Sequence, residues 1–266
     1  MNSDLHDRHA LVSGAGSGIG AATALALAHE GCRLTLSGRR IDALNAQAQR
    51  IRTQVPAAQI QVCAMDVTER ASVTAGVARA QAQFGPIHIL VNNAGQAESR
   101  PFLDTDPELW HRTLAVNLNG TYHLSQAVLT GMLQAAQQGT PGRIVNIAST
   151  AGLIGYNQVS AYVAAKHGVV GLTKALALEF AKKNITVNAL CPGYTDTEMA
   201  EQAVRNLCAK TGQSAEQARQ ALAQRNPMRR LVRPDEVASS VVWLCHHGSG
   251  SINGQALAID GGEQAA

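Results

Sequence analysis

The sequence has 266 residues, which is enough for one large α/β domain, and no linker, repeat or charge block divides it. Its 22 Lys and Arg against 19 Asp and Glu leave a net charge of +3, and the small arginine groups exclude a general nucleic-acid-binding stripe. The polar N-terminus and the lack of about 18 consecutive apolar residues predict a soluble, cytoplasmic protein outside the membrane. Five dispersed cysteines predict buried free thiols and no metal site.

Short apolar runs with β character alternate with alanine-rich amphipathic stretches along the whole chain. This alternation predicts an α/β fold with a parallel sheet and helices on both faces. The expected strands are 9–13, 33–37, 60–65, 87–91, 143–148, 186–190 and 256–259. The expected helices are 18–30, 41–54, 69–83, 107–138, 160–181 and 234–245.

Residues 194–230 interrupt this rhythm with polar helical patterns between the sixth strand and the helix that opens at Pro234. Insertions at the carboxyl ends of strands in such sheets tend to cover ligands. We therefore expect residues 1–266 to form a single cofactor-binding and catalytic domain, with 194–230 as a helical substrate lid. The alternative is a pair of solvated surface helices.

A glycine-rich turn follows the first strand directly and runs into the first helix. Gly16, Gly18 and Ala21 fit a G-x-G-x-x-A pattern, whereas Gly14, Gly18 and Gly20 suit a turn that begins where the strand ends. Such a turn lets the backbone approach a pyrophosphate, and the helix N-terminus offers free N–H groups. The expected cofactor contacts in this turn are Gly14, Ser17, Gly18, Ile19 and Gly20.

The end of the second strand carries no acid, although an NAD site usually presents one there to the adenosine ribose. Arg39 stands in this position and is suited to pairing with a 2′-phosphate. The sequence therefore favours NADP(H) over NAD(H), with NAD(H) possible. The alternative is that Arg39 and Arg40 are solvated at a helix start.

Polar and small residues follow the third and fourth strands, at the edge where parallel sheets bind ligands. Asp66 is suited to accepting from an adenine amino group, or to capping the helix expected near Glu69. The run after the fourth strand combines asparagines, which tie loops together, with small residues that permit close packing on a cofactor. The expected contacts are Asp66, Val67, Asn93, Ala94 and Gly95.

Tyr162 and Lys166 stand four residues apart in an expected helix, with Ser149 thirteen residues before Tyr162. Side chains at i and i+4 share a helix face, so the ammonium is expected to stabilise the phenolate and lower the tyrosine pKa. Ser149 would hydrogen-bond the oxygen that gains or loses the proton. Alone, this spacing is more often that of an ordinary surface pair, and a cofactor site elsewhere in the chain is needed to support a catalytic role.

Taken in order, these motifs resemble those of the short-chain dehydrogenase/reductase family. The resemblance rests on the glycine turn, Asn92-Asn-Ala-Gly95, Asn117 in Val-Asn-Leu-Asn-Gly, Ser149, Tyr162-x-x-x-Lys166 and Pro192-Gly193, and it covers about residues 10–262. It implies a Rossmann-type, doubly wound sheet of order 3-2-1-4-5-6-7, a nicotinamide cofactor and a homotetramer. It also implies the catalytic set Asn117, Ser149, Tyr162 and Lys166.

The resemblance carries further expectations about individual residues. Asn117 would hold a water that links Lys166 to solvent. The segment Pro192, Gly193, Thr195 and Thr197 would hold the nicotinamide carboxamide, although either threonine could instead cap the first lid helix. Tyr162 would exchange a proton with the substrate oxygen while hydride moves between substrate and nicotinamide. A cofactor-sensing protein without catalysis is the distant alternative, and the complete Ser/Tyr/Lys set speaks against it.

The substrate is expected to be a small molecule, a secondary alcohol or ketone on a moderately large apolar body. Residues 160–181 and the long lid resemble members that act on 3-hydroxy acids or 3-hydroxyacyl thioesters, and a steroid or cyclic alcohol is the alternative. Arg229, Arg230 and Arg233 are expected to meet a carboxylate or a coenzyme A phosphate, or to form surface ion pairs. The expected contacts are Gln96, Tyr156, Tyr194 and Met199, with apolar walls from Leu153, Ile154, Val159 and Leu207.

Overall fold

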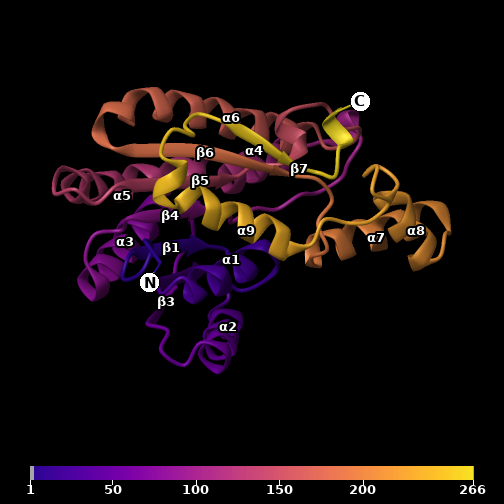
Figure 1. The fold of residues 1–266 in the computed structure, drawn as a ribbon. Helices are drawn as coiled ribbons and strands as arrows, with labels where there is room; N and C mark the ends of the chain where they lie inside the picture. Colours follow the sequence, from indigo (N-terminus) through magenta and orange to yellow (C-terminus); the bar gives the residue numbers. More distant parts are fainter. Residues whose placement is uncertain (1–2, 266) are drawn as a thin grey trace.

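The computed structural model describes residues 3–265, which form one seven-stranded sheet with helices on both faces. All strand pairs are parallel, and the order is β3-β2-β1-β4-β5-β6-β7 (Figure 1). This confirms the predicted fold class and strand order. The strands are β1 (His9–Ser13), β2 (Arg33–Gly38), β3 (Ile60–Ala64), β4 (Ile89–Asn92), β5 (Gly142–Ile147), β6 (Ile185–Pro192) and β7 (Ala256–Ile259).

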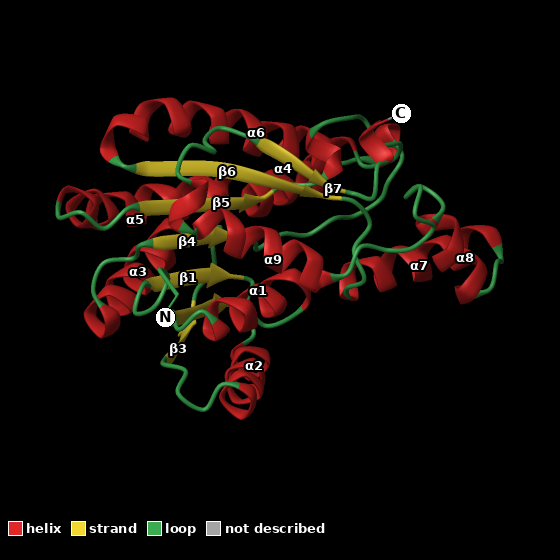
Figure 2. Ribbon diagram, in the orientation of Figure 1, coloured by secondary structure: helices red, strands yellow, loops and turns green. Residues whose placement is uncertain are grey.

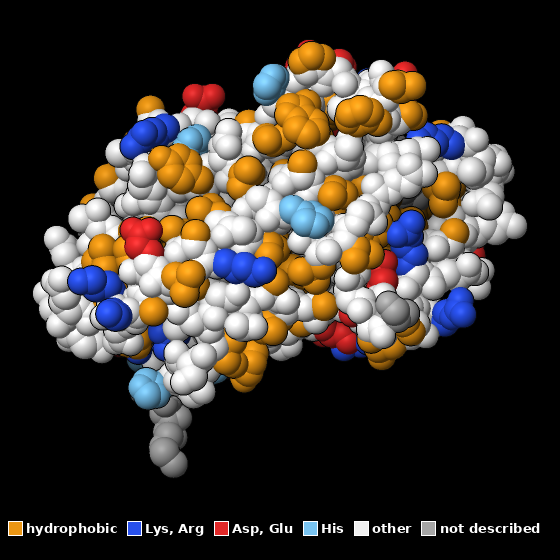
Figure 3. Space-filling model, turned by 90° about the horizontal axis from the view of Figure 1, so that it is seen from above, with side chains coloured by type: hydrophobic (Ala, Val, Ile, Leu, Met, Phe, Trp, Pro, Cys, Tyr) orange, Lys and Arg blue, Asp and Glu red, His pale blue; other side chains and the backbone are white. Residues whose placement is uncertain are grey.

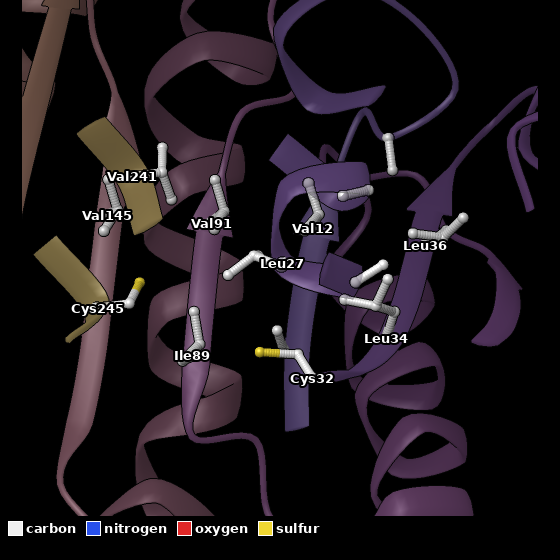
Figure 4. Close-up of a cluster of buried hydrophobic side chains, with 14 of the residues drawn as sticks. Val12, Leu27, Cys32, Leu34, Leu36, Ile89, Val91, Val145, Val241 and Cys245 are labelled. Carbon is white, nitrogen blue, oxygen red and sulfur yellow. The ribbon is translucent and has the colours of Figure 1, made fainter. Parts of the chain in front are cut away.

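One face of the sheet is covered by α1 (Gly18–His29), α2 (Ile41–Gln54) and α9 (Pro234–Cys245). Apolar residues of these helices and of the strands form a continuous buried cluster, in which Leu27 and Val241 point toward Val12 and Val91 of the sheet (Figure 4). Because β1 is buried along its whole length, its three central residues are all apolar instead of alternating with polar ones.

The opposite face carries α3 (Arg70–Phe84), α5 (Gly120–Gln137) and α6 (Ser160–Phe180), with α4 (Pro107–Leu114) packed against α6. The single helix expected over 107–138 is interrupted by a π-helical turn, Ala115–Asn119. Such a turn widens the backbone by one residue and frequently lies at functional sites. Short 3₁₀ turns occupy Phe102–Asp104, Thr150–Gly152, Ala181–Lys183, His247–Ser249 and Glu263–Ala265.

The segment after β6 contains α7 (Glu198–Thr211) and α8 (Ala215–Ala223), which project beyond the strand arrowheads in Figure 2. Ser214 and Gln217 form a capping box at the start of α8, which satisfies the first backbone N–H groups of that helix. A parallel bridge between Thr195 and Val232 joins the two ends of the segment at its base. The helical structure expected in 194–230 is therefore present as α7 and α8, which extend from the edge of the sheet where the strands end.

The surface gives two further observations. Seen from above, the Lys and Arg side chains lie apart from one another and do not form a stripe (Figure 3). Among residues 3–265, no helix has both the length and the apolar character that crossing a bilayer requires.

Candidate active site

A cavity of about 820 Å³ runs along the carboxyl ends of the strands and under the lid helices. Its walls come from the glycine turn, the ends of β2 to β6, the start of α6 and the lid. Almost every residue that the sequence places in a site lines this cavity. Among the expected catalytic and cofactor-binding residues, Gly20 and Asn117 are the exceptions, because neither is among the residues that line it.

The glycine turn after β1 has the geometry of a cradle. Gly14 and Gly18 have φ angles of +65° and +54°, and a Cβ on Gly20 would lie 2.4 Å from the backbone oxygen of Gly14. These three glycines are therefore required by the backbone, which decides between the two patterns that the sequence left open. The first turn of α1 contains no acid, so its free N–H groups are available to an anion, as a cofactor pyrophosphate requires.

Hydrogen bonds between the end of β1 and the loop after β4 hold the cradle against the rest of the sheet. The Ser13 hydroxyl accepts hydrogen bonds from the backbone N–H of Asn93 and of Ala94, at 3.0 and 3.1 Å. The Asn93 amide donates to the backbone oxygens of Ser13 and Gly14, at 2.9 and 3.2 Å. The expected role of this asparagine in tying neighbouring loops together is thus visible in its contacts.

Three charged residues lie at the far end of the cavity from Tyr162. Arg40 donates to the Ser17 hydroxyl and to the Glu198 carboxylate, each at 3.2 Å, and so links the cradle to α7. Arg39 is exposed and makes no hydrogen bond or ion pair to any residue within 3–265. Asp66 uses one oxygen in a turn with Thr68 instead of capping α3, which leaves its other oxygen to face the cavity.

Ser149, Tyr162 and Lys166 meet where β5 and β6 end and α6 begins. The Lys166 ammonium donates to the backbone oxygen of Ile147 at 2.8 Å and lies 5.5 Å from the centre of the Tyr162 ring. The Ser149 hydroxyl accepts from the backbone N–H of Ala151 at 3.1 Å, which fixes the oxygen at the cavity wall. The i and i+4 pair therefore shares one face of α6, as the spacing predicts.

The expected direction of the tyrosine shift is wrong. Burial raises the pKa of the Tyr162 phenol to about 12, and the Ser149 hydroxyl offsets only part of this rise. Burial also lowers the pKa of the Lys166 ammonium to about 8. Desolvation acts against the charged form of each group, and here it outweighs the attraction that the spacing suggested.

Asn117 lies in the π-helical turn and is buried. Its amide donates to the backbone oxygens of Gln96 and Thr113, at 2.8 and 2.9 Å, and its side-chain oxygen accepts from the Gln96 N–H at 3.3 Å. A Cβ on Gly95 would lie 2.9 Å from that oxygen and 3.8 Å from the Lys166 ammonium. Asn117 thus braces the loop beside Lys166 from behind, using both of its amide hydrogens and one of the two lone pairs of its oxygen.

The segment from Pro192 to Thr197 closes the middle of the cavity. Strand β6 extends to Pro192, two residues further than expected. Thr197 occupies the N-cap position of α7, but its hydroxyl donates to the backbone oxygen of Thr195 at 3.2 Å and does not cap the helix. Its methyl group lies 3.0 Å from the position of a Cβ on Gly18, so this segment faces the cradle directly.

The substrate side of the cavity agrees only in part with the prediction. Gln96, Tyr156, Tyr194 and Met199 line it, together with the expected Val159 and Leu207. Leu153 and Ile154 do not, because Leu153 packs into a small cluster with Ala148 and Val169 and Ile154 is 41% exposed. Val116, Leu222 and Arg225 also line the wall, although the sequence did not single them out.

Of the three arginines considered for the substrate, Arg230 and Arg233 form ion pairs. Arg230 makes two hydrogen bonds of 2.7 Å to Glu236, and Arg233 contacts Asp235 at 3.1 Å. Arg229 is exposed and is not among the cavity residues. Within the described part of the chain, no three His, Cys, Asp or Glu side chains are grouped as metal ligands.

Comparisons with known proteins agree with this geometry. A family model described as enoyl-(acyl carrier protein) reductase matches residues 14–264. The chain is 38% identical to D-beta-hydroxybutyrate dehydrogenase of Cupriavidus necator over 259 residues, which cover 97% of this chain and 98% of the relative. It is similar to a variant of actinorhodin polyketide ketoreductase solved with NADPH (TM-score 0.91, 38% identity, 97% and 98% coverage). It is also similar to levodione reductase (TM-score 0.92, 33% identity, 98% and 99% coverage).

Proposed function

Because the chain belongs to the short-chain dehydrogenase/reductase family, whose enzymes use a nicotinamide cofactor, we propose that it reduces a 3-oxoacyl-type ketone with NADPH. The chain is an oxidoreductase of hydroxyl and carbonyl compounds, the chemistry for which its relatives are named. One observation carries the proposal: Ser149, Tyr162 and Lys166 line the same cavity as the glycine cradle. A substrate carbonyl beside Tyr162 would then lie within reach of a cofactor held by the cradle.

The cofactor supplies a hydride to the carbonyl carbon. The residues of this chain handle the oxygen and its proton. Ser149 donates a hydrogen bond to the carbonyl oxygen and stabilises the negative charge that develops there. Tyr162, which is protonated at neutral pH and whose pKa burial raises further to about 12, donates its proton to the alkoxide. Lys166 stabilises the resulting phenolate, and its hydrogen bond to the Ile147 backbone oxygen holds that lysine in place.

The choice of NADP(H) rests on Arg39 and on the missing acid after β2. Its guanidinium is exposed at the cavity wall and forms no ion pair with a described carboxylate, although the Asp66 carboxylate is close enough to feel its charge, so a 2′-phosphate would meet an available cation. The similar polyketide ketoreductase was solved with NADPH, which points the same way. Comparing kcat/KM for NADPH and NADH tests this choice, and a strong preference for NADH would overturn it.

Tyr162→Phe tests the catalytic assignment. We expect kcat for ketone reduction to fall by about 10²–10⁴-fold, the usual value of a general acid, while the dissociation constant of NADPH changes little. Tyr122→Phe is the matched control, because Tyr122 is exposed on α5 and its hydroxyl contacts only Gln126. Retained turnover in Tyr162→Phe would place the proton donor elsewhere.

A cyclic ketone is the second candidate substrate. It is supported by the likeness to levodione reductase and by the apolar wall that Val159, Leu207 and Leu222 give the cavity. A panel of 3-oxoacyl thioesters, short 3-oxo acids, cyclic ketones, steroids and enoyl thioesters separates the candidates. The enoyl thioester belongs in the panel because the matching family model is described by that activity. Preferential turnover of the cyclic ketones would replace the first candidate.

We also propose that the enzyme is a homotetramer in the cytoplasm, as the family resemblance implies. Large apolar side chains exposed on three helices support an assembly: Tyr122 on α5, Leu178 on α6 and Trp243 on α9 are 41%, 84% and 49% exposed. Large apolar side chains exposed at a surface commonly mark protein contacts, and these three lie on both faces of the sheet: α5 and α6 on one, α9 on the other. Light scattering tests the assembly, and Leu178→Glu should lower the measured mass if α6 forms the contact.

A further inference from the structure

The C-terminal turn after β7 lies directly beneath the lid. The Asp260 carboxylate accepts hydrogen bonds from the backbone N–H of Gly262 and of Gln264, both at 2.9 Å. Gly261 and Gly262 have φ angles of +66° and +98°, which only glycine adopts without strain. This turn fixes the direction in which Glu263 leaves the backbone.

Glu263 points inward instead of toward solvent. Its side chain is only 10% exposed, and one carboxylate oxygen accepts a hydrogen bond of 2.6 Å from the Tyr156 hydroxyl. The same oxygen lies 4.0 Å from the Arg225 guanidinium, just after α8. The other oxygen would lie 3.3 Å from a Cβ on Gly193. Glu263 therefore contacts the substrate-side loop, the lid and the segment after β6.

The two side chains that Glu263 holds also contact each other. The Arg225 guanidinium stacks over the Tyr156 ring, 4.8 Å from its centre. Because Tyr156 donates its one proton to Glu263, the Thr150 hydroxyl is the donor in their 2.7 Å hydrogen bond. Thr150 directly follows Ser149. Tyr156, Thr150 and Arg225 all line the cavity, whereas Glu263 does not.

The lid itself contacts the same turn. Asn226, the residue after Arg225, is buried, and its side-chain oxygen would lie 2.0 Å from a Cβ on Gly261. That oxygen accepts from the backbone N–H of Met228 at 2.8 Å, so Asn226 shapes the return of the chain after α8. The lid thus packs against the turn after β7, and Gly261, which has no side chain, permits the close approach of Asn226.

We propose that Glu263 is a positioning residue that sets the substrate-side wall by holding Tyr156 against Arg225. The hydroxyl of Tyr156 is already hydrogen-bonded to Glu263 and Thr150, so this residue offers the substrate its ring and not its hydroxyl. The Arg225 charge is compensated by Glu263, so the wall formed by these residues suits an uncharged, apolar part of the substrate. This inference rests on the proposed ketone reduction and concerns substrate binding, not proton transfer.

Three variants test the role in substrate binding. For Glu263→Ala we expect KM for the ketone to rise about 10-fold, the usual effect of losing a hydrogen bond to a charged group, with kcat nearly unchanged. Glu263→Gln keeps an acceptor for Tyr156 and should recover part of the loss. Glu216→Gln, an exposed carboxylate on the same lid, should behave as wild type. The dissociation constant of NADPH should be equal in all three.

A double-mutant cycle tests whether Glu263 acts through Tyr156. The effects of Glu263→Ala and Tyr156→Phe on KM should be strongly non-additive, because both remove the same hydrogen bond. An unchanged KM in Glu263→Ala, or full additivity in the cycle, would overturn the inference. Loss of kcat with an unchanged KM would do so too, since it would mean a role in the chemical step.

Hydrogen exchange gives a readout that does not depend on turnover. In Glu263→Ala we expect faster exchange in both 150–158 and 215–226, with β1 unaffected. Unchanged protection in either segment would contradict the inference. If the wild-type enzyme reduces no ketone, the proposed function has failed, and the exchange experiment alone then decides whether Glu263 joins these segments.

Discussion

The most direct prediction about the cofactor concerns the pair of arginines after β2. The two side chains are adjacent in sequence and differ in their partners: Arg40 is held by Ser17 and Glu198, whereas the Arg39 side chain forms no hydrogen bond or ion pair with a described residue. If Arg39 receives the 2′-phosphate, then Arg39→Ala removes the phosphate contact without disturbing a protein contact. Arg40→Ala does the reverse and is the matched control.

The expected magnitude follows from the exposure of Arg39. A charge-assisted hydrogen bond contributes about 1.5–3 kcal/mol, and an exposed arginine belongs at the lower end because solvent and salt screen it. About 1.5 kcal/mol corresponds to roughly a 10-fold loss in kcat/KM for NADPH, with kcat/KM for NADH nearly unchanged. Arg39→Asp should lower the ratio of kcat/KM for NADPH to kcat/KM for NADH further, because its carboxylate would repel the phosphate and offer NADH a ribose partner.

Initial rates with both cofactors, measured at low and high salt, check the prediction. The loss in Arg39→Ala should shrink as salt increases, since a screened ion pair contributes less. Arg40→Ala should lower kcat/KM for the two cofactors by the same factor. If Arg40→Ala alone changes the preference, Arg40 is the phosphate ligand, and an unchanged preference in both variants would refute the electrostatic reasoning.

Three further predictions concern the cradle, the site and the base of the lid. Gly20→Ala should weaken NADPH binding in titrations by about 10-fold or more, because the new Cβ would lie 2.4 Å from the backbone oxygen of Gly14. Gly171→Ala is the control, because its Cβ would meet no atom within 4 Å, and it should bind NADPH as wild type does. Equal affinities in the two variants would contradict this prediction. Burial lowers the pKa of Lys166 to about 8, so kcat/KM for reduction should fall as pH rises through about 8, and a flat profile to pH 10 would count against this role. Hydrogen bonding to Arg230 lowers the pKa of Glu236 from 4.5 to about 2. Its stabilisation is therefore present above pH 4.5 and lost as pH falls through 2, so Glu236→Gln should lower Tm slightly at pH 7 and not near pH 2.

The strands and most helices follow from sequence periodicity because each buried strand is a short apolar run of a length typical of strands. The boundaries depend on tertiary contacts, and so β6 continues to Pro192, where it still pairs with β7. The π-helical turn at Ala115–Asn119 was not anticipated, because the apolar residues of 107–138 predict one continuous helix. Its presence could be observed only in the structure.

The motif residues of the site were predictable because they follow strands whose carboxyl ends share one edge of the sheet. The substrate wall was not, because it depends on how a loop turns. The 3₁₀ turn Thr150–Gly152 directs Leu153 into a core cluster and Ile154 toward solvent, although both are apolar and close to Ser149 in sequence. No sequence pattern predicted the role of Glu263, since Tyr156 lies 107 residues away in the chain and the other partner, Arg225, belongs to the lid.

The pKa values of the site bear on the direction of the reaction. A tyrosine with a lowered pKa would be partly ionised at neutral pH and ready to accept a proton from an alcohol. Burial instead raises the pKa of Tyr162 to about 12, which keeps the phenol protonated and ready to donate. Reduction needs the protonated form, whereas oxidation needs the phenolate. At neutral pH the free protein therefore holds Tyr162 in the protonated form that ketone reduction uses. Oxidation should become faster as pH rises toward the pKa of Tyr162.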